Sequence, residues 1–407
     1  MTVQAAVIAT SVRPCPQCGR TTVQPIHEGR FVLPEGHPLE PVVRVVACER
    51  CGFCFNDTPC TREDYDRYYR EISKYADPRL SSGAGASPED ALRLAATASA
   101  IRDFGTAINA RILDIGCGAG GLLDSLKAIG YSSLAGMDPA PACAAEVTRR
   151  GYRGIVGTLD DHPLGGEQPF DGVVLSHVLE HVYDVPAALA SIRELLAPDG
   201  WLYVEVPDAA RYGECLIAPY QDFNLEHINH FSASTLCHVL TTQGWHVVRE
   251  GQKTLALGHD RAYPAVFAFA RPAGPTSVAT DATTRDALAT YVSRSSGCME
   301  PIESILESHV LAGPIAVWGV GQFTMRLLGE TALGRATIAA FIDSNPIHHG
   351  RTLAGSPIVA PAEVHRHIAT DTPIVIGSLV NLESIEAAMR DLGLANPVIR
   401  LATVQAA

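Results

Sequence analysis

The chain has 407 residues, of which 47% are hydrophobic and 18% charged, and it carries a formal net charge of −13 at pH 7. This length predicts two to three domains with cores of their own, and the composition is that of a soluble α/β protein. The acidic balance and the lack of a basic stripe exclude a nucleic-acid substrate, and no apolar run approaches the ~18 residues of a membrane span. The first fourteen residues lack a basic start and a long apolar centre, so we expect no secretory signal and a cytoplasmic protein without membrane association.

Two matched Cys-x-x-Cys-Gly turns lie near the N-terminus. Each turn presents two thiolates, and four thiolates are the usual ligands of a closed structural zinc site. An iron centre or two redox pairs are the alternatives. Cys54 and Cys60 are alternative candidates for a ligand position, but we interpret them as small hydrophobic residues buried in the core. We therefore expect residues 1–80 to form a zinc-binding module whose Zn²⁺ ligands are Cys15, Cys18, Cys48 and Cys51.

Residues 65–75 hold four tyrosines on a predicted helix and the loop that follows it. Tyrosines at this density serve equally well in packing and as a lid over a flat polar substrate. Residues 81–87, rich in Gly and Ser, form a predicted hinge, and a helix over about 88–104 leads into the next domain. We place this central domain at residues 88–270.

An apolar run that ends in Asp114 is followed by Gly116, Gly118 and Gly120. The pattern predicts a strand that ends in a sharp turn, where a ligand can approach the backbone closely. A second predicted strand ends in Asp138, at the spacing where a carboxylate accepts hydrogen bonds from a ribose diol. The two segments together predict a nucleoside site.

Residues 170–181 predict a buried strand that runs into a helix from about Ser176, and residues 195–207 predict a helix end, a Pro-Asp-Gly turn and a fifth strand. With the glycine turn, these segments resemble the class I S-adenosylmethionine methyltransferases. The resemblance implies an α/β, Rossmann-like core that binds S-adenosylmethionine through Asp114, Gly116, Gly118, Asp138, Asp160 and Ser176. A nicotinamide enzyme and a non-catalytic nucleotide-binding domain are the alternatives.

Residues 222–232 follow the fifth predicted strand and contain Glu226, His227, Asn229 and His230. A histidine beside a carboxylate is suited to act as a general base near neutral pH, so we predict that Glu226 orients His227 for this role. Taken singly, one histidine would cap the helix expected near residue 232 and the other would pack in its neutral form. His181 is predicted to face the same cavity.

The rest of the sequence predicts a helix over about 284–311 and then a second nucleotide-type fold. A strand enters a Gly-x-Gly turn within residues 314–323, and another strand ends in Asp343. NAD is a candidate ligand, but Phe323 and Met325 stand where close helix packing requires a small residue. We therefore expect residues 284–407 to form a second Rossmann-like domain that helps to bind the substrate.

The order of these parts resembles the nucleotide-sugar C-methyltransferases of deoxysugar pathways, over essentially the whole chain. The resemblance implies methylation next to the carbonyl of a nucleotide-linked keto-deoxysugar, with His227 as the base and His181 as a further pocket histidine. Asn224 replaces the family's tyrosine before the Glu-His pair, and we expect it to donate a hydrogen bond to an oxyanion. Residues 258–263 replace a glycine- and serine-rich stretch of the family.

Other functions stay open at this point. One is O- or N-methylation of a small natural product or glycan, in which the same histidine deprotonates a hydroxyl or an amine. Another is a non-catalytic nucleotide-binding protein, and a third is an NAD-dependent oxidoreductase that uses the C-terminal domain. Each of these takes a small-molecule ligand, and none requires an oligomeric partner.

Overall fold

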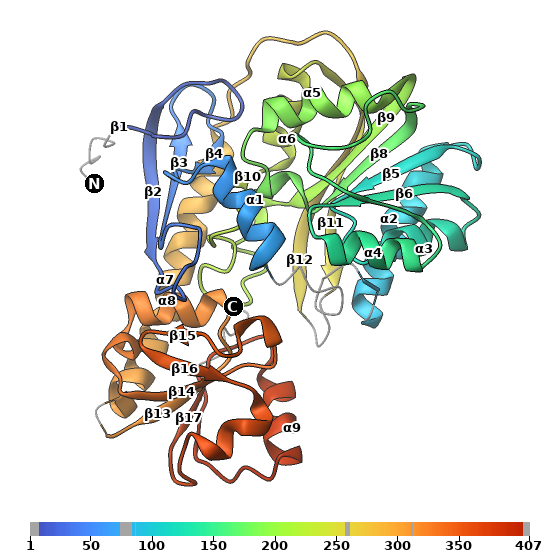
Figure 1. Cartoon of the computed structure of the whole chain (residues 1–407). Coiled ribbons are helices and arrows are strands. Elements are labelled where there is room, and N and C mark those ends of the chain that lie inside the picture. Colours follow the sequence, from blue (N-terminus) through green and yellow to red (C-terminus); the bar gives the residue numbers. More distant parts are fainter. Residues whose placement is uncertain (1–7, 74–83, 86, 257–260, 311, 402–407) are drawn as a thin grey trace. The chain divides into compact units, whose positions relative to one another are not determined.

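The computed structural model describes residues 8–73, 84–85, 87–256, 261–310 and 312–401, which form three sheets (Figure 1). The chain divides into two compact units. The first consists of Met1–Ile26, Val45–Cys215 and Glu226–Leu288, and the second of His27–Arg44, Leu216–Leu225 and Ala289–Ala407. No helix of the described ranges has the length and hydropathy needed to cross a membrane.

The N-terminal sheet has five strands in the order β1-β2-β3-β4-β10. Four of them come from the first 56 residues, at Ala9–Thr10, Thr22–Arg30, Val42–Cys48 and Cys54–Asn56. The fifth, β10 (Asn229–His230), comes from far along the chain and pairs antiparallel with β4. Because β10 begins two residues after His227, this pairing joins the predicted catalytic segment to the cysteine module.

Helix α1 (Arg62–Glu71) begins after Thr61, whose side chain accepts a hydrogen bond from the backbone N–H of Asp64 in a capping box. Helix α2 (Pro88–Asp103) begins after Ser87, whose side chain accepts a hydrogen bond from the backbone N–H of Asp90. The helix predicted over about 88–104 is therefore confirmed. The predicted hinge at 81–87 and Tyr75 lie mostly or wholly outside the described residues.

The central sheet has seven strands in the order β11-β12-β9-β8-β5-β6-β7. Strand β5 pairs in parallel with both β6 and β8, so the strand order changes direction there and opens a crevice at the carboxyl ends of these strands. The strands of this sheet are β5 (Arg111–Ile115), β6 (Ser133–Asp138), β7 (Arg153–Val156), β8 (Phe170–Ser176), β9 (Leu196–Pro207), β11 (Trp245–Ala256) and β12 (Ala262–Pro272).

Helices cover both faces of the central sheet (Figure 1). On one face α2 packs with α3 (Gly121–Ala128) and α4 (Pro141–Arg149) against side chains such as Ile112 and Val174. On the other face α5 (Val185–Leu195) and α6 (Ala233–Thr242) pack against side chains such as Leu113 and Val204. Because strands buried on both faces must be apolar throughout, β5, β8 and β9 read as nearly continuous hydrophobic runs.

The structure corrects two predicted boundaries. The helix expected from Ser176 begins only at Val185, where Asp184 accepts a hydrogen bond from the backbone N–H of Ala187. Between β8 and α5 the chain makes a short 3-10 turn over Leu179–His181 instead. The fifth strand, β9, starts at Leu196 and includes the Pro-Asp-Gly segment, where its register with β8 shifts.

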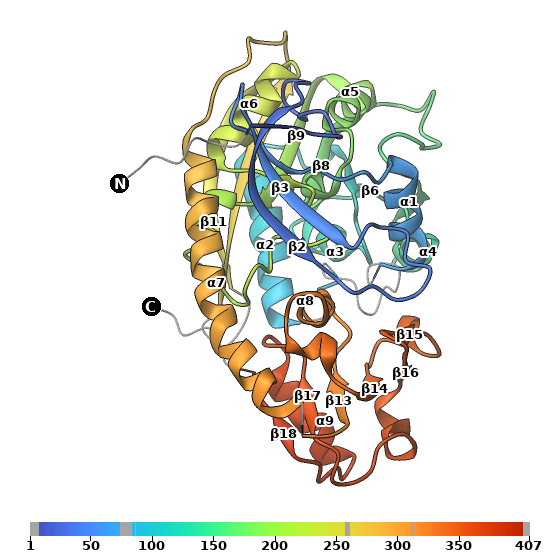
Figure 2. The ribbon, with the colours of Figure 1, turned by 90° about the vertical axis from the view of Figure 1, so that its left-hand side faces the viewer.

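The second unit contains a six-stranded sheet in the order β15-β16-β14-β13-β17-β18. Its strands are Thr352–Leu353, Ser356–Val359, Ile338–Ile342, Ile315–Trp318, Ile374–Ile376 and Val398–Ile399, in that order across the sheet. Helix α7 (Thr283–Val310), which Figure 2 shows as one long rod, leads into this unit, and α8 (Gln322–Glu330) and α9 (Leu382–Asp391) belong to it. The predicted second Rossmann-like domain is thus confirmed as a fold.

A buried arginine holds the second unit's separate segments together. The guanidinium of Arg326 on α8 lies 4.6 Å from the ring centre of Phe31 and 5.1 Å from that of Tyr220, and it donates a hydrogen bond to the backbone oxygen of Phe223. Glu330 neutralises it at 3.0 Å. Asn224 belongs to this unit, where its side chain donates to the backbone oxygen of Gln221.

Candidate functional site

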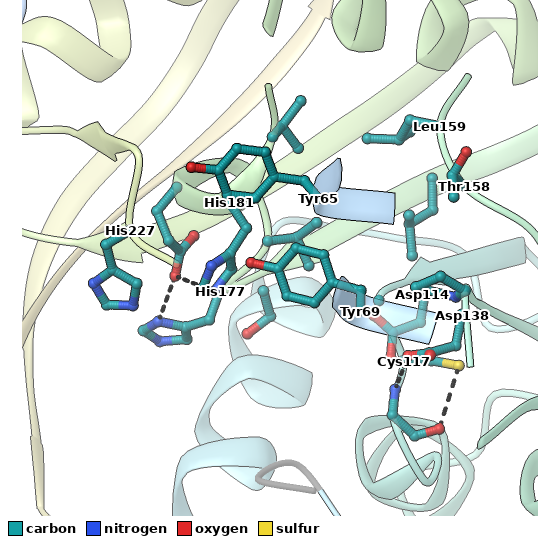
Figure 3. A pocket seen from close by; sticks show the side chains of 18 of the residues that line it. Tyr65, Tyr69, Asp114, Cys117, Asp138, Thr158, Leu159, His177, His181 and His227 are labelled. Atoms are coloured by element: carbon teal, nitrogen blue, oxygen red, sulfur yellow. Dashed lines mark hydrogen bonds and ion pairs between the residues drawn. The ribbon is translucent and has the colours of Figure 1, made fainter. Parts of the chain in front are cut away.

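A cavity of about 490 Å³ lies in the first unit at the carboxyl ends of β5, β6 and β8 (Figure 3). Loops that follow these strands form one side of it, and helix α1 contributes Tyr65 and Tyr69. All six residues predicted to bind the cofactor line this one cavity, namely Asp114, Gly116, Gly118, Asp138, Asp160 and Ser176. The tertiary structure therefore brings them together, while their individual roles stay predictions.

The glycine turn is held in place by backbone contacts. Gly116 has a φ of +70° and donates its N–H to the oxygen of Met137 at 2.8 Å. A Cβ atom at Gly116 would lie 2.5 Å from Cγ2 of Val178, so only glycine fits without displacing that side chain. The carboxylate of Asp138 accepts the N–H of Gly118 and that of Ala140, each at 2.9 Å, and thereby ties the end of β6 to the turn.

Two buried carboxyl groups sit beside this turn. Burial raises the pKa of Asp114 to about 8, with Arg93 opposing the shift and Asp138 adding to it. Burial likewise raises the pKa of Asp138 to about 6, against the effect of the two backbone N–H donors. A buried carboxyl group with an elevated pKa is favourable for binding a cation or a hydrogen-bond donor, because the ligand restores the interactions that burial removes.

The other end of the cavity is lined by imidazoles. The rings of His181 and His227 lie 5.0 Å apart between centres at an angle of 65°, and Nδ1 of His181 is 3.0 Å from the backbone oxygen of Glu226. Tyr69 contacts the ring of His181 edge to face at 5.7 Å. Figure 3 shows His181 and His227 on the same side of the cavity, away from Asp114 and Asp138. The cavity thus has an acidic glycine-turn end and a histidine end.

The carboxylate of Glu226 has a different partner from the one expected of it. Its Oε1 accepts a hydrogen bond of 2.6 Å from the phenol of Tyr68 on α1. Glu226 is buried and is not among the residues that line the cavity, whereas Glu180 is. His230 packs in the core, where burial and then the charge of Arg13 lower its pKa to about 3, so it is a neutral packing residue.

His177 lines the cavity as well, although it was not among the predicted site residues. This residue, labelled in Figure 3, has a φ of +58°, a left-handed conformation that is costly for a side chain with a Cβ. Its ring lies between two carboxylates. Nδ1 is 3.4 Å from Oε1 of Glu180, and Nε2 is 3.4 Å from Oε1 of Glu205. Lys253 forms an ion pair with Glu205 at 2.5 Å. A charged residue inside an apolar strand, as Glu205 is in β9, was the signal in the sequence.

The charges of this cluster balance one another. Burial alone would lower the pKa of His177, but its hydrogen bonds and ion pairs with Glu180 and Glu205 outweigh burial and raise the pKa to about 9. Burial would raise the pKa of Glu205, but His177 and Lys253 hold it far below its usual range. His177 is therefore an imidazolium at neutral pH, fixed between two carboxylates.

The four predicted zinc ligands lie in a cluster of their own in the N-terminal module. Their sulfur atoms are within 4.8 Å of one another, with 3.5 Å between Cys15 and Cys51 and 3.5 Å between Cys18 and Cys48. This set of four sulfurs fits a tetrahedral metal ion. Cys54 and Cys60 are buried outside the cluster, as expected of packing residues.

The module also fixes the segment that carries His227. The guanidinium of Arg13 donates to the backbone oxygen of Ile228 and to the side-chain oxygen of Asn229, each at 2.9 Å. Of the family-specific stretch at 258–263, residues 258–260 lie outside the described residues, whereas Tyr263 lines the cavity.

Comparison with known proteins adds independent information. Residues 63–250 match the family model described as a methyltransferase domain. The ubiquinone biosynthesis O-methyltransferase of Azorhizobium caulinodans is 39% identical over 100 residues, which are 23% of this chain and 39% of that protein, and the one from Methylocella silvestris is 37% identical over 99 residues, 23% and 38%. The chain spans about two fifths of the length of these curated relatives.

Among solved structures, the 1,6-didemethyltoxoflavin-N1-methyltransferase of Burkholderia thailandensis is 19% identical, with a TM-score of 0.39, and the match covers 56% of this chain and 98% of that chain. An S-adenosylmethionine-dependent methyltransferase from Mesorhizobium loti is also 19% identical, with a TM-score of 0.34, over 42% of this chain and 96% of that chain.

Proposed function

We propose, because residues 63–250 form a class I S-adenosylmethionine-dependent methyltransferase domain, that this protein transfers the methyl group of S-adenosylmethionine to a small-molecule acceptor. One observation carries the proposal. The six residues assigned to the cofactor and the two histidines assigned to the acceptor line the same cavity, in which His181 and His227 lie away from Asp114 and Asp138 (Figure 3). A methyl donor at the glycine turn and an acceptor beside the imidazoles would therefore meet within it.

The residues present at the glycine turn fit the cofactor. The turn leaves backbone N–H groups and no side chains at Gly116 and Gly118, and the buried carboxyl groups of Asp114 and Asp138 suit hydroxyl and ammonium donors. Asp160, which pairs with Arg62 of α1 at 3.2 Å, would flank the base of the nucleoside. When bound, the cofactor supplies an already activated methyl group, so the protein has to position the acceptor and make it nucleophilic.

We further propose that the acceptor is a carbon next to the carbonyl of a nucleotide-linked keto-deoxysugar. This rests on the order of the three parts of the chain and on the Glu226-His227 pair, both of which resemble the nucleotide-sugar C-methyltransferases. A ring nitrogen of His227 takes the proton from the acceptor carbon, and the electron pair of the broken C–H bond forms the enolate. The enolate carbon would then form a bond to the methyl group of the donor, and the electrons of the broken bond between methyl carbon and sulfur would stay on sulfur. His227 would afterwards release its proton to water.

O-methylation is the second candidate, and the curated relatives favour it, because both are named O-methyltransferases. In that reaction His227 would remove a proton from a hydroxyl group rather than from carbon. The two reactions place the same demands on the cofactor end of the cavity. They differ only in the acceptor atom that loses the proton.

The test combines binding with isotope exchange. We expect S-adenosylhomocysteine to bind in calorimetry and the keto-sugar nucleotide acceptor to exchange its labile C–H with D₂O in the enzyme, observed by NMR. His227→Asn should slow exchange and methyl transfer by about 10²- to 10⁴-fold without weakening S-adenosylhomocysteine binding. His246→Asn, at an exposed histidine on β11, is the control and should change neither.

Each negative result has its own meaning. Methyl transfer to oxygen without exchange would replace C-methylation by O-methylation. A folded protein that binds no S-adenosylhomocysteine would overturn the methyltransferase assignment altogether. Near-parental turnover of His227→Asn would remove His227 as the base and leave the reaction in place.

A further inference from the structure

We infer that Glu180, and not Glu226, is the carboxylate that positions His181 and His227 and stabilises the positive charge that forms on the base. We also infer that His177 holds Glu180 in place for this task. The inference rests on the proposed function, because it concerns the base of that reaction. It differs from the sequence-based expectation, which assigned the orienting role to the neighbour of His227. Glu180 lines the cavity, whereas Glu226 does not.

Glu180 lies where a positioning carboxylate is needed. It lines the cavity, its side chain is only 2% exposed, and its Oε1 is 3.8 Å from Nε2 of His181. One carboxylate oxygen of Glu180 and one ring nitrogen each of His181 and His227 all lie within 4.8 Å of one another. Among the described residues, Oε2 of Glu180 has no hydrogen-bond partner. A buried carboxylate oxygen without a donor is costly, so it is suited to receive a proton-bearing group during the reaction.

The side chain of Glu226 is hydrogen-bonded to helix α1. Its carboxylate accepts the phenol proton of Tyr68 from α1, and it is the backbone oxygen of Glu226 that lies within hydrogen-bond distance of Nδ1 of His181. That contact fixes the ring of His181 with Nε2 turned toward Glu180. Glu226 thus supports the site through its backbone and anchors α1 through its side chain.

His177 is the support of Glu180. Its ring is held between Glu180 and Glu205 in a left-handed backbone conformation, and Lys253 and Tyr203 complete the partners of Glu205. Strain of this kind persists only where the surrounding contacts fix it, and it clusters at functional sites. The ring of His177 holds one carboxylate on each side, with Nδ1 3.4 Å from Oε1 of Glu180 and Nε2 3.4 Å from Oε1 of Glu205.

The consequence for the reaction is a charge effect on the base. When His227 takes the acceptor proton, the imidazolium forms within 4.8 Å of a carboxylate oxygen of Glu180, and attraction between the two groups favours the proton transfer. In the described part of the chain, the ionisable groups around the pair include His177, Glu205, Lys253, Glu226, Tyr65, Tyr69 and Tyr263.

The experiment measures the pKa of His227 directly, without an acceptor. Imidazole resonances of histidine-labelled protein saturated with S-adenosylhomocysteine are titrated by NMR and assigned with His227→Asn and His181→Asn. Glu180→Gln should lower the pKa of His227 by about one unit or more. Glu226→Gln, the matched control on a second buried carboxylate, should shift it by less than about 0.3 units.

A second measurement covers the case in which Glu180→Gln does not fold. In the unaltered protein labelled with ¹³C at Glu carboxyl carbons, the Glu180 resonance should move with the titration of His227 and the Glu226 resonance should not. The opposite pattern, in the variants or in the label, would overturn the inference and restore Glu226. Selective broadening of His181 and His227 by micromolar Mn²⁺ would also overturn it, because the cluster would then be a cation site. Neither result depends on methyl transfer, so failure here is distinct from failure of the proposed function.

Discussion

The phenol of Tyr68 donates a hydrogen bond of 2.6 Å to the carboxylate of Glu226, a residue 158 positions further along the chain. This contact ties helix α1 to the segment that carries His227. Since α1 also places Tyr65 and Tyr69 in the cavity, one buried hydrogen bond links the wall of the cavity to its predicted base. The tyrosine-rich segment therefore serves both packing and the lining of the site.

Removal of this donor should destabilise the fold. Tyr68→Phe leaves the buried Glu226 carboxylate without its phenol partner, and we expect the free energy of unfolding to fall by about 1–3 kcal/mol in urea. Tyr152→Phe is the control, because its hydroxyl bonds to the exposed Asp124 and its loss should cost under about 0.5 kcal/mol. Equal losses in the two variants would contradict the role given to the Tyr68–Glu226 bond.

The cysteine cluster should hold one zinc ion per chain. Elemental analysis of purified protein is expected to show one zinc atom, and Co²⁺ substitution should give thiolate-to-metal charge-transfer bands. Cys48→Ser should lose the metal, whereas Cys298→Ser, at a half-buried cysteine on α7, should retain it. Since β4 of this module pairs with β10, metal loss should also disturb the NMR signals of His227. Iron, or no metal in any preparation, would refute the zinc prediction.

Asp114 should make stability depend on pH in a defined direction. Its pKa is raised to about 8 in the folded protein by burial, against about 4 in an unfolded chain, so the folded state holds a proton that the unfolded state releases. The contribution of this group is therefore fully present below about pH 4 and is lost as pH rises toward 8. In ligand-free protein, the raised pKa of Asp114 should lower the free energy of unfolding by on the order of 2–4 kcal/mol between pH 5 and 8, and Asp114→Asn should abolish this decrease. Parallel pH profiles of parent and variant in urea unfolding would contradict this.

Gly116 should be required for ligand binding for a steric reason. A Cβ there would meet Val178 at 2.5 Å, and the resulting displacement should weaken S-adenosylhomocysteine binding by about tenfold to a hundredfold in calorimetry. Gly151→Ala is a matched control, because Gly151 has a φ of +87° but open space around the added carbon. The double variant Gly116→Ala with Val178→Ala should recover part of the affinity. No recovery would point to backbone strain instead of the contact with Val178.

The conformation of several segments depends on residues that are close together in the sequence. The glycine turn after Asp114, the strand that ends in Asp138 and the cysteine turns each involve residues close together along the chain, so their spacing alone predicts their conformation. The start of α2 was predictable for the same reason, because Ser87 and Pro88 form a helix start by themselves. The start of α5 was not, since the apolar run around Ser176 suits a helix as well as the 3-10 turn that packing imposes.

The sequence by itself determined the class of fold and the set of residues around the glycine turn, because apolar periodicity and glycine positions encode them directly. Only the tertiary structure decided which carboxylate serves which histidine. Glu226 was the expected partner of His227 because the two residues are adjacent in the sequence. Side chains of neighbouring residues point in different directions, however, and the carboxylate of Glu226 accepts a hydrogen bond from Tyr68. Glu180 and Glu205 meet at His177, and Lys253 pairs with Glu205, because β8, β9, β12 and β11 stand in one sheet, an arrangement that no local pattern records.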